Sequence, residues 1–133
     1  MKSSLKLLLS MLVAIPLFYS CDFYFGTDFY NLRGTSWECY EGNKNNNVIR
    51  TIEFNSSNSA TLYIDETRFG IILKDAYDFT YDGSYPNIYL YDKNNGKCIY
   101  ECKMKGSGVM FVGYPGFDEE YRDDYRIYSK IYY

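Results

Sequence analysis

The side chains best able to do chemistry in this 133-residue chain are four cysteines and a few adjacent acidic pairs, because the chain contains no histidine. Histidine is the commonest general base and metal ligand, so Ser-His-Asp and Cys-His catalytic arrangements are excluded. The pairs Asp65-Glu66 and Asp123-Asp124 do not suit glycosidase chemistry, since neighbouring strand residues point to opposite faces. We predict no catalytic residue and no enzyme activity.

Three of the cysteines, Cys39, Cys98 and Cys102, could form one disulfide or remain reduced. Cys98 and Cys102 are four residues apart, which on a regular strand separates them by about 13 Å, too far for a bond. A bridge would therefore join Cys39 to one of them, and export would make it chemically possible. Alternatively, all three are buried thiols that act as small apolar residues. Three cysteines without histidine do not suit zinc, and we predict no metal and no cofactor.

The fourth cysteine, Cys21, follows a segment built like an export signal. Lys2 and Lys6 form a basic start, and residues 7–18 form an apolar run of about a dozen residues. A membrane-spanning helix needs about 20 apolar residues, so this run is too short to span comfortably. We therefore predict that residues 1–20 are a signal peptide and that the protein is exported.

The junction Phe18-Tyr19-Ser20-Cys21 resembles the lipobox of bacterial lipoproteins. In that family the cysteine becomes the first mature residue, with a diacylglycerol on its sulfur and a fatty acid such as palmitate on its amine. The resemblance implies that Cys21 is the lipid attachment site and that the protein is anchored to the cell envelope, with the outer membrane as the expected location. Two or more acyl chains make such anchoring stable. The alternative is a plain secreted protein in which Cys21 is incidental.

Removing residues 1–20 leaves 113 residues, which is enough for one domain. The net charge changes from −3 to −5, because the removed segment holds Lys2 and Lys6 and leaves 12 basic against 17 acidic residues. Nucleic-acid binding depends on basic contacts to phosphates. An acidic chain without a Lys/Arg run is therefore not expected to bind nucleic acid.

From Gly34 onward, short stretches that alternate apolar and polar residues are separated by turn residues, a pattern typical of β-strands. The pair Asn95-Gly96 is a strong hairpin signal. The predicted strands cover residues 35–40, 48–54, 60–64, 69–73, 77–81, 87–91, 98–104, 109–114 and 125–131. Eight or nine strands joined by short loops favour a closed meander, because closure removes the exposed edges. We predict an all-β fold, a single small antiparallel up-and-down β-barrel over residues 34–133, preceded by a lipidated tether over residues 21–33.

The alternation also predicts which side chains face the interior. The expected core consists of Trp37, Ile52, Phe54, Leu62, Ile64, Phe79, Leu90 and Phe111. Cys39 should point inward with Trp37, and Cys98 and Cys102 should point inward with Tyr100. A disulfide from Cys39 would have to cross the barrel, so we expect a bridge to accompany a filled interior and free thiols to be compatible with a hollow one.

The segment Leu32-Arg33-Gly34-Thr35-Ser36-Trp37-Glu38, which opens the meander, resembles the lipocalin-like domains of Gram-negative lipoproteins. Lipocalins carry Gly-x-Trp on the first strand, and here the spacing from Gly34 to Trp37 is one residue longer. In that family an arginine on the last strand packs on the tryptophan. The resemblance therefore implies a cation–π contact between Arg126 and Trp37. The alternative is that Trp37 is a plain core residue.

These observations predict a non-enzymatic cell-envelope lipoprotein with a lipocalin-like barrel. It would contact the membrane through its N-terminal lipid and bind a small apolar ligand or another envelope protein. The alternative function is inhibition of a hydrolase through an exposed loop over residues 114–120. A hollow barrel would favour ligand binding, whereas a filled barrel with a rigid protruding loop would favour inhibition.

Overall fold

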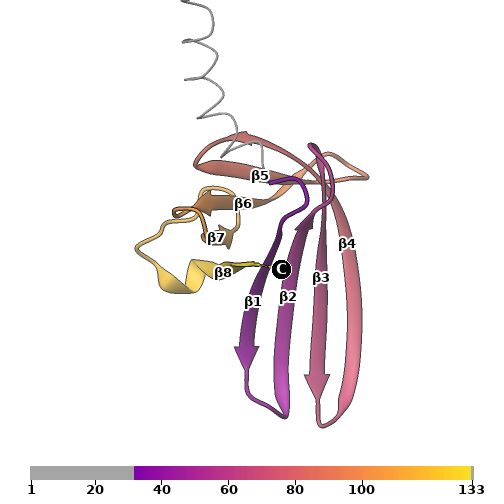
Figure 1. The fold of residues 1–133 in the computed structure, drawn as a ribbon. Helices are drawn as coiled ribbons and strands as arrows, with labels where there is room; N and C mark the ends of the chain where they lie inside the picture. Colours follow the sequence, from indigo (N-terminus) through magenta and orange to yellow (C-terminus); the bar gives the residue numbers. More distant parts are fainter. Residues whose placement is uncertain (1–31, 133) are drawn as a thin grey trace, which may run out of the picture. The chain divides into compact units, whose positions relative to one another are not determined.

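The computed structural model describes residues 32–132, which lie within one compact unit, Leu32–Tyr133. Its elements are β1 (Ser36–Gly42), β2 (Asn46–Phe54), β3 (Ser59–Arg68), β4 (Ile71–Ser84), β5 (Asn87–Asp92), β6 (Cys98–Met104), β7 (Val109–Gly113), the short 3₁₀ helix η1 (Arg122–Asp124) and β8 (Tyr125–Ile131). Each strand pairs antiparallel with the next, and β8 pairs back with β1. The predicted all-β fold is confirmed as a closed, eight-stranded up-and-down barrel (Figure 1).

The predicted signal peptide (residues 1–20) and the lipid attachment site Cys21 lie outside the described residues. The predicted tether (residues 21–33) also lies outside them, except for a turn at Leu32 and Arg33. Within residues 32–132, no helix has the length and hydropathy that a membrane span would need.

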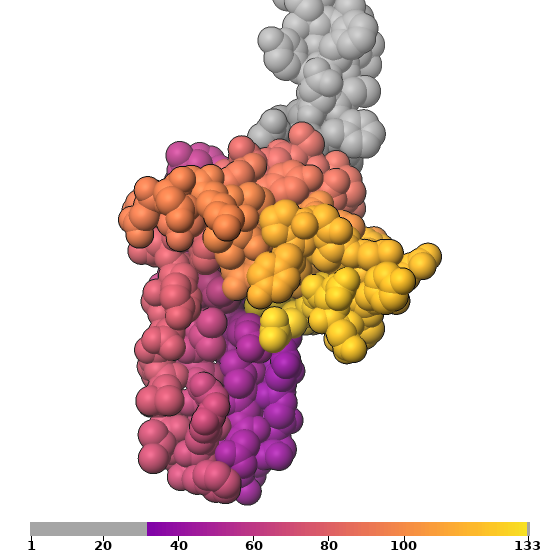
Figure 2. All heavy atoms as spheres, turned by 180° about the vertical axis from the view of Figure 1, so that it is seen from behind, coloured from indigo at the N-terminus to yellow at the C-terminus, as the bar shows by residue number. Residues whose placement is uncertain are grey.

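The strands differ in length, and this divides the molecule into two halves. β2, β3 and β4 contain 9, 10 and 14 residues, whereas β5, β6 and β7 contain 6, 7 and 5. The hairpins formed by β1–β4 therefore extend beyond β5–β8, and Figure 2 shows them as a column that projects from the rest of the barrel. The long β4 replaces two predicted strands, residues 69–73 and 77–81, because residues 74–76 between them also pair with β3.

The pairing pattern shows where the barrel is open. β1 pairs with β8 only from Ser36 to Glu38, and β4 pairs with β5 only from Phe79 onward. Residues 39–42 of β1 and 71–78 of β4 consequently pair on one side only within the described chain. We call the fully paired part the closed half and the projecting part of β1–β4 the open half.

The hydrophobic core lies in the closed half. Trp37 is 1% exposed and lies opposite Lys130 of β8. The other buried apolar side chains of the barrel strands are Cys39, Ile52, Phe54, Ala60, Leu62, Phe79, Ile88, Leu90, Cys102, Met104, Met110, Val112, Tyr125 and Tyr128. Six of the eight predicted core residues are therefore confirmed as buried, whereas Ile64 and Phe111 are half-buried.

The prediction for Phe111 was wrong, because β7 has the opposite orientation. Met110 and Val112 are its buried residues, so Phe111 points to the outer surface. There its ring stacks on Tyr125, with the ring centroids 4.6 Å apart, and Phe117 packs on Tyr125 at 5.3 Å. We call Phe111, Phe117 and Tyr125 the outer aromatic cluster. It fastens the loop between β7 and β8 to the outside of the barrel.

Candidate functional site

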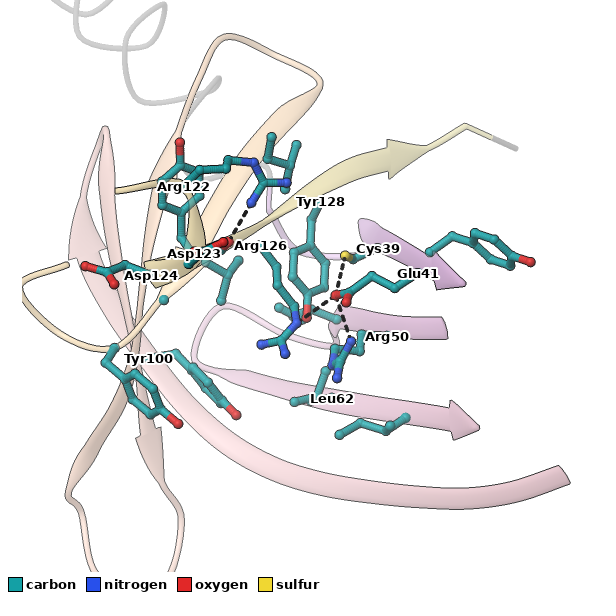
Figure 3. Close-up of a pocket in the computed structure, with 18 residues that line it drawn as sticks. Cys39, Glu41, Arg50, Leu62, Tyr100, Arg122, Asp123, Asp124, Arg126 and Tyr128 are labelled. Atoms are coloured by element: carbon teal, nitrogen blue, oxygen red, sulfur yellow. Dashed lines mark hydrogen bonds and ion pairs between the residues drawn. The ribbon is translucent and has the colours of Figure 1, made fainter. Parts of the chain in front are cut away.

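A cavity of about 530 Å³ lies at the end of the barrel where β1 and β8 separate. Its lining comes from the inner faces of β1–β3 on one side and of β6–β8 on the other (Figure 3). Four aliphatic residues form an apolar floor, namely Ile52, Leu62, Ile64 and Val112. Three tyrosines, Tyr100, Tyr114 and Tyr128, form an aromatic wall. The rim is charged and includes Glu41, Arg50, Arg122, Asp123, Asp124 and Arg126.

One carboxylate, Glu41, joins two arginines at this rim. Its Oε1 accepts a hydrogen bond from Arg50 Nη1 at 2.9 Å and another from Arg126 Nε at 2.7 Å. Burial alone would raise the pKa of Glu41, but the hydrogen bond and charge of Arg126, with the charge of Arg50, hold that pKa below its usual value. The carboxylate therefore stays ionised, and the three residues together carry one net positive charge.

The thiol of Cys39 lies beside this group, with its Sγ 3.7 Å from Glu41 Oε1. Burial raises the pKa of Cys39, and the neighbouring charge of Glu41 raises it further. A cysteine reacts as its thiolate. A protonated thiol next to a carboxylate is a weak nucleophile, so Cys39 lines the cavity without being activated.

The aromatic wall offers flat apolar faces together with hydroxyl groups. Tyr100 and Tyr114 stack with ring centroids 6.3 Å apart and an interplanar angle of 21°. Burial raises the pKa values of Tyr100 and Tyr128. Their hydroxyls therefore remain protonated at neutral pH and can donate hydrogen bonds to a ligand.

The predicted contact between Arg126 and Trp37 is absent from the described structure. Trp37 faces Lys130, and Arg126 lies four residues earlier on β8, a separation of about 13 Å along a strand. A cation–π contact needs about 6 Å. Arg126 shares the inner side of β8 with Tyr128 and pairs with Glu41 instead, while Trp37 Nε1 donates to Thr35 Oγ1 at 3.0 Å. Trp37 thus fits the alternative of a core residue.

Cys39, Cys98 and Cys102 are all free in the structure. Cys102 points inward as predicted, but Cys98 does not share its face. A β-bulge lets Leu90 pair with Tyr100 while Tyr91 pairs with Cys98. This irregularity turns Cys98 outward, towards the side chains of Asp82 and Glu101. Of the three, only Cys39 lines the cavity, and free thiols are compatible with a hollow interior.

The acidic pairs do not form a cation site. Asp65 and Glu66 lie on β3 with opposite orientations, and Asp123 and Asp124 belong to η1 at the cavity rim. In the part of the chain that the structure describes, no three acidic or cysteine side chains converge as metal ligands would.

The loop over residues 114–120, the predicted inhibitory loop, is held against the barrel instead of standing free. Gly116 N donates to the buried carboxylate Glu101 at 2.8 Å, and Lys103 Nζ lies 4.4 Å from the centre of the Phe117 ring. Gly113 permits this packing, because a Cβ there would lie 2.6 Å from Asp124 O and 2.8 Å from Phe117 Cδ1. Tyr114 remains exposed on the loop.

The ion-pairing residues Glu41 and Arg50 were missed at the sequence level, although the alternation of inward and outward residues contains the signal. Glu41 lies two residues after Cys39, and Arg50 lies two residues before Ile52, so each continues the inward side of its strand. Charged residues on an inward face become acceptable only where the barrel opens to solvent. That position depends on strand pairing, which the sequence does not reveal.

The fold and the cavity together define a small eight-stranded barrel with an interior site that opens beside a charged rim. Comparisons with protein-family models, with curated proteins and with solved structures found no match to this chain. The resemblance to lipocalin-like domains therefore stays a prediction, based on the motif at Gly34–Trp37 and on the observed topology.

Proposed function

We propose that this protein is a non-enzymatic cell-envelope lipoprotein that binds a small ligand in the barrel cavity. The cavity is the observation that supports ligand binding most directly, because its volume of about 530 Å³ falls in the range typical of small-molecule sites. The signal-like residues 1–20 and the lipobox at Cys21 support export and anchoring, with the outer membrane as the proposed location.

The lining suggests what kind of ligand would bind. Ile52, Leu62 and Ile64 suit an apolar body, and the tyrosines can stack on a flat group. At the rim, Arg50 and Arg126 share a single carboxylate, so hydrogen-bond donors remain for an acceptor on the ligand. We therefore propose a mainly apolar small molecule that carries one polar or anionic group.

The absence of enzyme activity is also part of the proposal. The chain has no histidine, and the Cys39 thiol and the hydroxyls of Tyr100 and Tyr128 have raised pKa values. These groups can position a ligand by hydrogen bonding, but they are poorly suited to accept a proton or to attack a carbon atom.

Fluorescence titration with 8-anilinonaphthalene-1-sulfonate, an apolar anionic dye, tests the proposed site. We expect saturable one-to-one binding that is lost in Ile64→Trp, which fills the floor of the cavity. Arg126→Met should weaken dye binding by about tenfold or more, because a hydrogen bond to a charged group is lost. The control Ile72→Trp adds the same ring outside the cavity and should bind normally. Equal binding by both tryptophan variants would refute the site.

The anchor is tested separately. Intact-mass measurement of the protein extracted from membranes should show an N-terminus at Cys21 that carries diacylglycerol and a further acyl chain. An unmodified Cys21, or a soluble protein that begins at another residue, would contradict this part of the proposal without affecting the cavity.

A second candidate function, inhibition of a hydrolase, rests on the exposed Tyr114 alone, since the loop over residues 114–120 lies against the barrel and the interior is hollow. Anchoring through Phe117 and Glu101 presents Tyr114 on a fixed backbone, as an inhibitory loop requires. Purified peptidoglycan hydrolases and proteases should then be inhibited at stoichiometric concentration, and Tyr114→Ala should abolish the inhibition. Full activity of every hydrolase tested would count against this candidate.

A further inference from the structure

The tip of the hairpin between β3 and β4 exposes an unusual concentration of apolar side chains. Phe69 is 84% exposed, and Ile71, Ile72 and Leu73 are each more than half exposed. Monomeric soluble proteins rarely leave large apolar side chains grouped in this way unless the group contacts something else. These four residues, which we call the apolar tip, have no role in the barrel core or in the cavity.

The backbone at the tip supports a functional origin for this exposure. Phe69 and Gly70 form a two-residue turn in which both have positive φ, 49° and 83°. Such a turn favours Asn-Gly, because a bulky side chain at the first position is sterically unfavourable. Phe69 gains little packing in return, since its ring is almost fully in solvent. An unfavourable residue without a compensating contact points to a role outside the folded domain.

The apolar residues occupy both faces of the hairpin. Ile71 and Leu73 project to one side of β4, and Ile72 projects to the other. A partner that packed on one face of the sheet would leave the other side exposed. Apolar groups on both faces and at the turn suit end-on insertion into an apolar layer.

Charged and amide side chains surround the tip. The neighbouring β1–β2 turn lies beside it, because Phe69 N donates to Asn45 O at 3.1 Å. The charges here are balanced, since Arg68 Nη2 lies 2.6 Å from Glu66 Oε1 and Lys74 lies opposite Asp65. A collar that carries both signs is complementary to lipid headgroups that carry both a phosphate and an ammonium group.

We propose that the apolar tip enters the interfacial region of a lipid bilayer, with Phe69 deepest and the ion pair of Arg68 with Glu66 at the level of the headgroups. Insertion is shallow, because residues 71–78 of β4 have backbone groups that pair on one side only, and unpaired groups are excluded from hydrocarbon. This contact adds to the proposed lipid on Cys21 and depends on neither that lipid nor the ligand in the cavity.

Quenching by brominated lipids tests the contact directly. The full chain carrying Phe69→Trp is reconstituted into vesicles of phosphatidylethanolamine and phosphatidylglycerol whose acyl chains are brominated. Tyr121→Trp, in the exposed β7–β8 loop, is the matched control, and the native Trp37 contributes the same buried background to both proteins. We expect the indole at position 69 to lose most of its added emission, and the indole at position 121 to keep it. Leu73→Trp provides a second reporter within the tip, which should also be quenched.

The other possible occupants give different results. If iodide in the aqueous phase quenches position 69 and the brominated lipid does not, the tip remains in water and the proposal is wrong. If neither quencher reaches position 69, a protein covers the tip, and the proposal is equally wrong. The lipid on Cys21 is tested by mass measurement and the insertion of the tip by fluorescence quenching. A negative result for one proposal is therefore distinguishable from a negative result for the other.

Discussion

The closed and open halves of this barrel share four strands but differ in what each residue contributes. In the closed half, every strand has two neighbours and the inward side chains are buried, as Leu90 shows at 0% exposure. In the open half, the first eight residues of β4 are all exposed. Folding stability should therefore come almost entirely from the closed half. The open half contributes little to stability, so its residues can be selected for contacts with other molecules.

The largest contrast should appear when leucine is truncated in each half. Leu90→Ala removes a fully buried side chain and should lower the free energy of unfolding by about 2–5 kcal/mol. Leu73→Ala, in the apolar tip, should change it by no more than about 0.5 kcal/mol. Urea unfolding of both variants measures the difference. Similar losses in the two variants would show that the open half is part of the cooperative core.

A smaller loss in the free energy of unfolding is expected on the outside of the closed half, where the β7–β8 loop packs on the barrel. Gly113→Ala places a Cβ against Asp124 O and the ring of Phe117, so the β7–β8 loop must shift, at a cost of about 1–3 kcal/mol. The control Gly108→Ala meets only the hydroxyl of Tyr132, the end of a flexible side chain. If the two variants unfold at the same urea concentration, the outer aromatic cluster does not hold the loop.

In the open half, one substitution should increase stability. Phe69→Asn replaces a residue that is unfavourable at positive φ with one that adopts this conformation readily, and it should add up to about 1 kcal/mol. Ile72→Asn removes an apolar side chain from the same tip without relieving the turn, so it should add nothing. Thermal unfolding checks both variants. A loss of stability in Phe69→Asn would mean that the ring packs on the folded domain.

The ion pairs at the cavity should give a pH dependence smaller than these effects. The pKa of Glu41 is lower in the folded protein than its ordinary value of 4.5. Its stabilising contribution is therefore complete above about pH 4.5 and is lost as the pH falls through the lower folded value. In Glu41→Gln this contribution is missing, so stability should fall less between pH 5 and pH 3 than in the unmodified protein. Glu120→Gln, in the exposed loop, is the control and should follow the unmodified curve.

The smallest effect is expected from reduction. Cys39, Cys98 and Cys102 are free, so a reducing agent should leave the unfolding temperature unchanged. Thiol titration of the denatured, unreduced mature protein should find three thiols. A single thiol would reveal a disulfide, and dye binding inside the barrel of such a bridged protein would defeat the expected link between free thiols and a hollow interior.

Much of the barrel could be predicted because alternation and turn residues act locally. Ile52 and Phe54 share a buried face as their spacing indicates, and the turn at Asn95-Gly96 joins β5 to β6. Prediction from the local sequence failed where pairing with a neighbouring strand decides whether a segment is a strand. Residues 74–76 read as a break between two strands, yet they lie within β4 because β3 continues beside them.

The candidate site was less predictable, because its residues meet only after closure. Arg126 was singled out from a family resemblance, but its partner depends on the register of β8 against β1, which places Lys130 opposite Trp37. The outward turn of Cys98 depends on a bulge in the pairing of β5 with β6. Neither the register nor the bulge leaves a mark in the local sequence.

The seam between β1 and β8 has a consequence for how the protein is made. It consists of three facing pairs, Ser36 with Ile131, Trp37 with Lys130 and Glu38 with Ser129, which come from opposite ends of the described chain. Contacts between such distant residues carry a large entropy of loop closure and form slowly. A chain emerging from the ribosome N-terminus first therefore has β1 paired with β2 on one edge only, until residues 129–131 of β8 arrive. During that interval the newly made chain is most exposed to aggregation and proteolysis, and the barrel becomes resistant only when its last strand is in place.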